Sequence, residues 1–396
     1  MEWVIKPLGE LVTFERGLTY SKSDEAEYSS NGVLRSNNVD LETNSLNLGE
    51  IKYLNADFII PSSKKVVRNS LLMCMSYGSK SHLGKVALIE NDLDYAFGGF
   101  MGLLKPIETV ILPRYLYYSL ISPAYKKHIQ SLSDGANINN LKYKDLSVFP
   151  VMLPMSLSEQ QRIVDILDDE FAKIDALKEN TEKNLQNAKD LFQAVLRKEL
   201  EPKEGWRQTS IGKVCVLKSG NSNANNSPVG SLPFVKVGDM NIKGNEEKIT
   251  CSSNYVSYGE NRKNIFPIGT IIFPKRGGAI LTNKKRITAV EICCDLNIMG
   301  VYSLGEILPE YLYFHFLTVD LSKIYNGAAI PQINNGDISP LCISYPIEKK
   351  EQQKIIDKLI LHKSNSMALH LNYEKTIALC NDMKQALLRK AFNGEM

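Results

Sequence analysis

A unit of roughly two hundred residues occurs twice in this chain, and the duplication restricts the folds that the chain can adopt. The segment Gly135–Leu141 returns 192 positions later as Gly327–Ile333. At the same displacement, without a gap, Glu159–Gln161 pairs with Glu351–Gln353, and a Leu-Arg-Lys triplet recurs near the end of each copy. An ungapped match of this length indicates a true internal repeat, so we expect two similar structural units.

The two copies do not match equally well along their length. Trp3 and Gly9 correspond to Trp206 and Gly212 at a displacement of 203, whereas the later segments keep 192. Each unit is therefore a divergent head followed by a well-matched tail. The predicted domains are a first head at 1–155, a first long helix at 156–200, a second head at 201–348 and a second long helix at 349–396.

Each tail predicts one long helix. Residues 159–200 contain no proline or glycine, and their apolar residues recur in steps of three and four, as in a coiled coil. About 42 residues at 1.5 Å each give a rod of roughly 60 Å, too long for a lone helix of a compact domain. The predicted seam residues are Ile163, Leu167, Phe171, Ile174, Leu177, Leu185, Leu191 and Val195 in the first helix, and Ile355, Leu359, Tyr373, Ile377, Met383 and Leu387 in the second.

The two apolar stripes are expected to pack against each other as an antiparallel coiled coil, because neither can remain in water. The stripe is weaker in the second helix, where Lys363 and Ser366 stand in place of Phe171 and Ile174. An alternative, in which each helix packs only on its own head, stays open. The predicted fold class is α+β, with two mixed α/β heads, two long helices and an internal pseudo-two-fold repeat.

Each head contains a stretch without acidic residues. Residues 61–89 and 261–290 carry several Lys and Arg but no Asp or Glu, although the net charge of the chain is only +3. A turn with glycine interrupts each stretch, and glycine lets a backbone approach a ligand closely. Cationic, hydroxyl and imidazole side chains can contact phosphates and base edges. The predicted DNA-contacting residues are Arg35, Lys64, Lys65, Tyr77, Ser79, Lys80, His82 and Lys85 in the first head, and Lys236, Arg262, Lys263, Lys275, Arg276, Lys284, Lys285 and Arg286 in the second.

The sequence shows no active site. It contains no H-E-x-x-H and no G-x-S-x-G motif, and its five histidines do not cluster along the chain. Phe97–Gly102 has only a superficial likeness to a glycine-rich cofactor loop, and we interpret it as a packing feature of a strand or turn. Seven cysteines without a C-x-x-C pair favour reduced thiols over a metal site. We predict no catalytic residue, no metal ligand and no cofactor bound by this chain.

The chain gives no indication of a membrane segment. No apolar run approaches the eighteen or so residues that a spanning helix needs. The first residues lack the basic-then-apolar order of a signal peptide. We therefore expect a cytoplasmic protein without membrane contact.

The repeated motifs resemble those of the specificity subunits of type I restriction–modification systems. Two starts of the form Pro-x4-Glu-Gln-Gln-Arg/Lys-Ile, at Pro154–Ile163 and Pro346–Ile355, carry the resemblance together with the long helices that end in Leu-Arg-Lys. The Gly-Ala-x-Ile segments before these starts also match, as does the Trp-x4-Leu/Ile-Gly entry to each head. The resemblance covers essentially the whole chain, and its helical repeats are the most specific part.

The resemblance implies a division of labour. Each head would be a target-recognition domain that reads one half of a bipartite, asymmetric site in double-stranded DNA. The helices would set the unread spacer and dock methyltransferase subunits, two in number. S-adenosylmethionine, ATP and Mg²⁺ would bind to partner subunits, which include the restriction and translocation subunits of the assembled complex.

Two other functions are considered. The chain could be a non-catalytic coiled-coil scaffold with two protein-binding heads, although the basic stretches disfavour it. It could also be a methyltransferase or nuclease fragment that acts alone, which the missing motifs disfavour.

Overall fold

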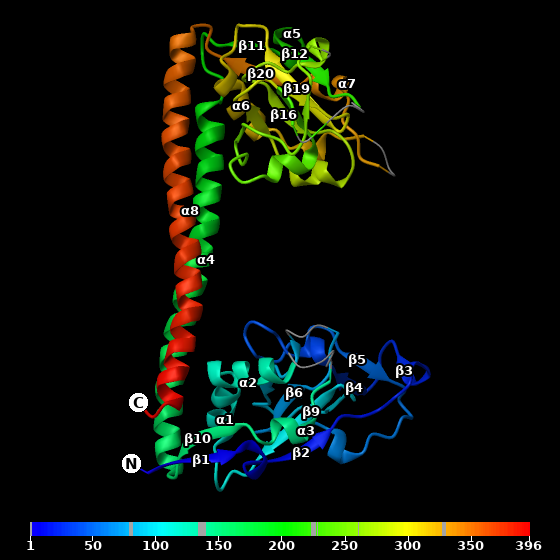
Figure 1. Cartoon of the computed structure of the whole chain (residues 1–396), viewed down its shortest axis with the longest axis vertical. Helices are drawn as coiled ribbons and strands as arrows, with labels where there is room; N and C mark the ends of the chain where they lie inside the picture. Colours follow the sequence, from blue (N-terminus) through cyan, green and yellow to red (C-terminus); the bar gives the residue numbers. More distant parts are fainter. Residues whose placement is uncertain are drawn as a thin grey trace. The chain divides into compact units, whose positions relative to one another are not determined.

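The computed structural model divides into two compact units. Unit 1 consists of Met1–Glu182 with Lys375–Met396, and unit 2 consists of Lys183–Glu374. Each unit contains one head of strands and short helices, together with one part of each long helix (Figure 1). The structure describes residues 2–78, 82–133, 140–222, 227, 229–259, 261–326 and 330–396.

The head of unit 1 is built from three sheets with the strand orders β1-β10, β2-β9-β6-β7 and β3-β5-β4-β8. Its strands are β1 (Trp3–Pro7), β2 (Val12–Arg16), β3 (Glu25–Ala26), β4 (Asn31–Leu34), β5 (Lys52–Leu54), β6 (Leu71–Cys74), β7 (Val86–Leu88), β8 (Tyr95–Phe97), β9 (Met101–Pro106) and β10 (Pro150–Pro154). Its helices are α1 (Pro113–Leu120), α2 (Pro123–Ser133) and α3 (Tyr143–Leu146).

The core of this head lies between its central sheet and helix α1. All four residues of β6 are buried, as expected of a continuous apolar run in the middle of a sheet. Pro113 occupies the start of α1, where a missing N–H costs nothing. The helix then buries Tyr115 and Leu116 in the same core as Leu71 and Met73 of β6.

The head of unit 2 repeats this arrangement with the sheets β11-β20, β12-β19-β16-β17-β14 and β15-β13-β18. Its strands are β11 (Arg207–Ser210), β12 (Cys215–Ser219), β13 (Leu232–Val235), β14 (Lys248–Ile249), β15 (Tyr255–Val256), β16 (Ile271–Pro274), β17 (Arg286–Thr288), β18 (Cys293–Cys294), β19 (Ile298–Ser303) and β20 (Cys342–Tyr345). Its helices are α5 (Ile211–Val214), α6 (Pro309–Thr318) and α7 (Asn335–Ile338).

The two predicted long helices are α4 (Leu157–Glu199) and α8 (Lys349–Phe392), and they pair in an antiparallel manner within each unit. In unit 1, Lys384 Nζ of α8 lies 2.5 Å from Asp175 Oδ1 of α4. In unit 2, the early part of α8 meets the late part of α4, where Lys358 Nζ lies 2.6 Å from Glu199 Oε1. The predicted α+β fold with paired helices is confirmed, and the alternative of helices that contact only their own heads is wrong.

Most of the predicted seam is buried or half-buried, but three residues are not. Leu177, Leu191 and Met383 are 47%, 62% and 48% exposed, so their assignment to the seam was wrong. From Ile174 the buried positions of α4 follow alternating steps of four and three, which lead to 178 and 192 rather than 177 and 191. Met383 misses its seam by one position in the same way. The other predicted seam residues are buried or half-buried: Ile163, Leu167, Phe171, Ile174, Leu185, Val195, Ile355, Leu359, Tyr373, Ile377 and Leu387.

Unit 2 contains a histidine that folding keeps neutral. His315 lies on α6, and its Nε2 atom is buried without a hydrogen-bond partner among the described residues. Burial lowers the pKa of this imidazole to about 4, from an ordinary value of 6.5. Below pH 6.5 the unfolded chain therefore binds a proton here that the folded unit does not bind until about pH 4.

The stability that His315 contributes should be fully present above pH 6.5 and lost progressively as the pH falls toward 4. Between pH 7.5 and 5 we expect a loss of about 2 kcal/mol in the free energy of unfolding of unit 2. Urea titrations of a Trp3→Phe variant can measure it, because Trp206 then reports on unit 2 alone. His315→Gln should remove this share of the pH dependence, and an unchanged slope would contradict the assignment.

Candidate nucleic-acid interface

The ends of several strands meet at one edge of the first head. Gly17 N donates to Met101 O at 3.0 Å, and Gly98 N donates to Leu34 O at 2.9 Å. Met75 N donates to the carbonyl of the residue that precedes β9, at 2.8 Å. These bonds bring together the ends of β2, β4, β6 and β8 and the start of β9. We call this edge rim 1 and define it as residues 17–19, 35, 75–78 and 98–100.

The same bonds recur in the second head. Gly220 N donates to Ile298 O at 2.9 Å, and Asp295 N donates to Val235 O at 3.0 Å. Lys275 N donates to Asn297 O at 2.7 Å. We call this edge rim 2 and define it as residues 220–221, 236, 275–277 and 295–297. The correspondence aligns Lys275 with Met75, Arg276 with Ser76, and Asn297 with Phe100.

Each rim depends on one glycine where two backbones cross. A Cβ atom on Gly17 would lie 1.9 Å from Gly98 O, and one on Gly220 would lie 1.9 Å from Asp295 O. No side chain can be accommodated at such distances. The rims therefore keep the same backbone, although the side chains they present differ.

Three lysines of the predicted DNA-contacting set are buried, so the prediction that they contact DNA was wrong. Lys85, Lys275 and Lys285 are 7%, 8% and 3% exposed. Their ammonium groups donate to Val39 O at 2.6 Å, to Ser219 Oγ at 2.8 Å and to Asn283 Oδ1 at 2.6 Å. Burial lowers the pKa of each, that of Lys285 to about 8. Lys275 is buried because it occupies the position of the core residue Met75.

Four more of the predicted cations are engaged within their own heads. Lys64 pairs with Glu15 and Lys65 pairs with Asp94, so neither charge is free. Lys284 donates to the amide oxygen of Asn241. The guanidinium of Arg286 donates to the carbonyls of Lys285 and Met240. These four residues hold the loops of the heads together, which argues against a primary role in binding phosphate.

Five predicted cations remain, and three of them, Arg35, Lys236 and Arg276, belong to the rims. Arg35, Lys236, Arg262, Lys263 and Arg276 form no ion pair with any residue that the structure describes. Arg35 follows β4 and Lys236 follows β13, so the two stand at equivalent places. Lys263 lies beside β12, because its carbonyl accepts a hydrogen bond from Lys218 Nζ at 2.8 Å.

Tyr77 of rim 1 stacks on His82, and both were predicted to contact DNA. The rings of Tyr77 and His82 lie 4.3 Å apart between centroids. The pKa of His82 is lowered by burial, which favours the neutral imidazole at pH 7. Ser79 and Lys80, which were also predicted to contact DNA, lie outside the described residues.

Sequence reasoning missed the residue that stands out most on rim 1. Phe100 is 70% exposed, although the segment 97–102 was interpreted as a packing feature. The neighbouring Phe97, Met101 and Gly102 are indeed buried. The register between β6 and β9 begins at Met101, so Phe100 lies just outside the paired strands and stays exposed. This register cannot be deduced from the sequence.

A buried glutamine fixes each head to the start of its helix. Gln160 is fully buried; its Oε1 accepts from Leu112 N at 2.9 Å, and its Nε2 donates to the carbonyls of Val110 and Pro154 at 3.0 Å. Gln352 makes the same three bonds in unit 2, with Leu308 N, Glu306 O and Pro346 O. The middle glutamine of the repeated Glu-Gln-Gln motif therefore has the same structural role in both units, which explains its recurrence.

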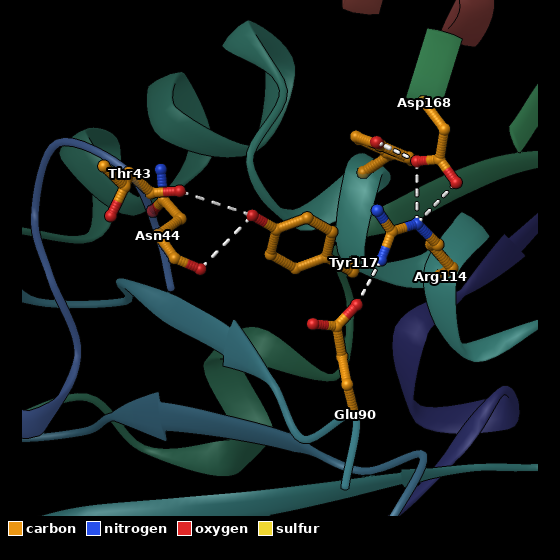
Figure 2. Close-up of polar contacts among 7 residues, drawn as sticks. Thr43, Asn44, Glu90, Arg114, Tyr117 and Asp168 are labelled. Atoms are coloured by element: carbon orange, nitrogen blue, oxygen red, sulfur yellow. Dashed lines mark hydrogen bonds and ion pairs between the residues drawn. The ribbon is translucent and has the colours of Figure 1, made fainter. Parts of the chain in front are cut away.

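The first head is also held to the long helices by an ionic network. Arg114 of α1 donates through Nε to Asp168 of α4 at 2.7 Å and pairs with Glu90, while Tyr118 donates to the same aspartate (Figure 2). Tyr117 donates to Asn44 O at 3.2 Å. These residues line a cleft of about 1150 Å³ within unit 1.

Unit 2 attaches its head differently. The positions that correspond to Arg114 and Asp168 are Glu310 and Ile360, which cannot form this ion pair. Instead, Lys363 Nζ of α8 lies 2.7 Å from Glu247 Oε1 and 5.0 Å from the centre of the Tyr313 ring. Lys363 interrupts the apolar stripe because it serves the attachment of the head.

No group of three or more His, Cys, Asp or Glu among the described residues could hold a metal ion. Within the same residues, no helix is both long enough and apolar enough to cross a membrane.

The two heads share the backbone of their rims but present unlike side chains, and a long helix follows each head. This arrangement defines a two-headed recognition protein. Residues 1–187 and 203–374 match the family described as the type I restriction modification DNA specificity domain. The chain therefore belongs to the specificity subunits of type I restriction–modification systems, which are the non-catalytic components of those complexes. The alternative of a methyltransferase or nuclease acting alone is wrong.

Curated relatives and solved structures agree with this family. The chain is 27% identical over 426 residues to the StySPI specificity subunit of Salmonella potsdam, covering 100% of this chain and 89% of the relative. It is 26% identical over 421 residues to the EcoKI specificity subunit of Escherichia coli (strain K12), again covering 100% and 89%.

The fold is shared with solved structures at lower identity. One comes from work on complex assembly and conformational transition of the type I R-M system, with a TM-score of 0.81, 16% identity and coverage of 100% of this chain and 98% of that chain. The HsdS subunit from Thermoanaerobacter tengcongensis gives a TM-score of 0.58 at 18% identity, covering 100% and 97%.

Proposed function

We propose that this specificity subunit reads a bipartite, asymmetric site in double-stranded DNA, with rim 1 on one half and rim 2 on the other. The observation that carries the proposal is the pair of rims, which share their backbone hydrogen bonds but not their side chains. Where rim 1 has Ser76 and Phe100, rim 2 has Arg276 and Asn297. Unlike side chains on equivalent frames suit two half-sites of unlike sequence.

The free cations support DNA as the ligand. Arg35 and Lys236 stand at equivalent rim positions and form no ion pair with a described residue, and Arg276 is exposed on rim 2. Such residues can position the duplex through its phosphates, while polar and apolar side chains of the same rims contact base edges. The scaffold alternative, with protein-binding heads, gives no reason for cations at both rims that have no ion-pair partner in the described part of the chain.

The helices are proposed to serve two further purposes. As a paired rod they would keep a fixed distance between the two contacted half-sites, which leaves an unread spacer. Their outer faces would dock methyltransferase subunits, two per specificity subunit, and α8 offers the exposed apolar residues Ile360, Leu361, Met367 and Leu371 for such contacts. We propose that this chain itself binds no cofactor, and that S-adenosylmethionine, ATP and Mg²⁺ act on the methyltransferase and restriction subunits.

Mapping of methylated positions in cells tests this function. A cell that carries the subunit with its methyltransferase partner should modify one bipartite sequence with a constant gap. Four residues inserted after Glu182 and four after Glu374 lengthen both helices by about 6 Å, or one to two base pairs of about 3.4 Å. The two half-sites should then stay the same while the gap grows by that amount.

The outcomes separate the parts of the proposal. Unchanged half-sites with an unchanged gap would contradict the spacer role of the helices. Modification without any sequence preference, in the presence of the partner, would contradict DNA reading by the heads and favour the scaffold. A variant with four substitutions at exposed helix positions, rather than insertions, serves as the matched control and should keep the original gap.

A further inference from the structure

Phe100 has an unusual place for a phenylalanine. Its side chain is 70% exposed at the turn between β8 and β9. The ring therefore adds little hydrophobic stabilisation to the fold. Its backbone is held firmly, because its carbonyl accepts hydrogen bonds from Met75 N at 2.8 Å and from Ser76 N at 3.1 Å. The ring therefore projects from a fixed point of the rim rather than from a loose loop.

The surroundings of Phe100 contain a cation and little bulk. The two preceding residues are Gly98 and Gly99, so no other side chain of this turn stands beside the ring. A Cβ atom on Gly98 would lie 3.8 Å from Arg35 Cγ, so Arg35, which has no ion pair among the described residues, lies next to the turn that carries Phe100. An exposed apolar ring and a cation at the same turn are a suitable contact surface for the groove of a nucleic acid, with the cation near phosphate and the ring near bases.

The second head presents different chemistry at the same position. Asn297 takes the place of Phe100, and its carbonyl accepts from Lys275 N as that of Phe100 accepts from Met75 N. The side chain of Asn297 is oriented by Asp295, which accepts from Nδ2 at 3.0 Å. A ring in one head and an amide in the other mark this position as one where the two heads differ in what they can recognise.

The major groove of DNA offers an apolar ring one apolar partner, the C5-methyl group of thymine. The N7, O6, N6, N4 and O4 groups that otherwise distinguish the bases there are hydrogen-bond donors or acceptors, which phenylalanine cannot satisfy. We propose that Phe100 is a specificity-determining residue that contacts a thymine methyl group in the half-site read by the first head. The inference rests on the proposed function and adds the chemical group that this position of rim 1 selects.

Deoxyuridine provides a direct test, because it pairs like thymine but lacks the methyl group. The probe is a duplex with the mapped target of the complex, in which each thymine of the first half-site is replaced in turn. Binding is measured with the subunit assembled with its methyltransferase partner. For the wild type, one replacement should weaken binding about fivefold, near the lower limit for a mismatched base pair.

The Phe100→Ala variant should bind the thymine duplex about as weakly as the wild type binds the deoxyuridine duplex. It should also be insensitive to the methyl group at that one position. Phe100→Leu, which keeps an apolar side chain, should retain part of the preference. Because the ring is exposed, these variants should fold normally, as checked by Trp3 fluorescence. Ile59→Ala, at an 87% exposed site outside the rim, is the matched control and should leave the methyl preference intact.

Several results would overturn the inference while leaving the proposed function in place. The first is a half-site of the first head that contains no thymine. The second is an equal weakening of binding by deoxyuridine in the wild type and in Phe100→Ala. The third is a loss of affinity in Phe100→Ala that is the same for every duplex. A sequence-dependent change in DNA bending without a methyl effect would point instead to a wedge between base pairs. Wild-type complex that binds every duplex equally would overturn the proposed function itself.

Discussion

Gln160→Ala is expected to lower the free energy of unfolding of unit 1 by about 3 kcal/mol. The amide of Gln160 is fully buried and satisfies Leu112 N–H and the carbonyls of Val110 and Pro154. Alanine would leave these three main-chain groups unpaired inside the protein, and each unpaired group costs about 1 kcal/mol or more. Urea titrations of a Trp206→Phe variant measure the effect, because Trp3 packs on the core of the first head.

The adjacent glutamine supplies the control. Gln161 is exposed, and its amide donates only to Asp165 on the same helix, at 2.7 Å. Gln161→Ala should therefore change the stability of unit 1 by no more than about 0.5 kcal/mol. Equal effects of the two substitutions would show that the buried amide does not fix the head to its helix. Gln352→Ala should have the corresponding effect on unit 2, reported by Trp206.

Arg276→Glu is expected to weaken binding of the complex to its target at least about tenfold, with the loss confined to the half-site read by the second head. Arg276 is exposed on rim 2 without an ion pair among the described residues, so the substitution replaces a phosphate- or base-contacting cation with a repelling anion. Loss of one phosphate contact should also reduce, by about one, the slope of the logarithm of the binding constant against the logarithm of the salt concentration. Titrations of labelled duplexes at several salt concentrations measure both quantities.

The neighbouring lysine is the matched control for this prediction. Lys275 is buried, donates to Ser219 Oγ and stands where the first head has Met75. Lys275→Met should therefore bind DNA within about twofold of the wild type, although it removes the same charge from the next position. A loss in Lys275→Met as large as in Arg276→Glu would mean that rim 2 is wrongly assigned. Equal losses at both half-sites would mean that the heads do not read separately.

The helices show how far a pattern of apolar residues can lead. Heptad spacing predicted both long helices and most of their buried positions, because burial of a stripe requires a period near 3.5 residues. It failed at Leu177, Leu191 and Met383, where apolar residues occur one position away from the seam. The sequence offers two adjacent candidates at such places, and only packing against the partner helix selects between them.

The candidate interface was predicted in part. The turns within the acid-free stretches follow β6 and β16, so these stretches reach the edges that we define as rim 1 and rim 2. They did not separate Arg276 from Lys275, nor Lys85 from the cations that stay exposed. Phe100 could not be identified at all, because an apolar residue beside a buried strand is expected to be buried as well.

The duplication and the two long helices were determined by the sequence alone, because these features depend on internal similarity and on local periodicity. Tertiary structure decided which cations remain free to bind a ligand. Lys85 Nζ donates a hydrogen bond to Val39 O, which lies 46 residues away along the chain. Lys275 Nζ donates to Ser219 Oγ, 56 residues away. Neither ammonium group is therefore available to a ligand. The availability of a charge depends on partners that only the fold brings within hydrogen-bond distance.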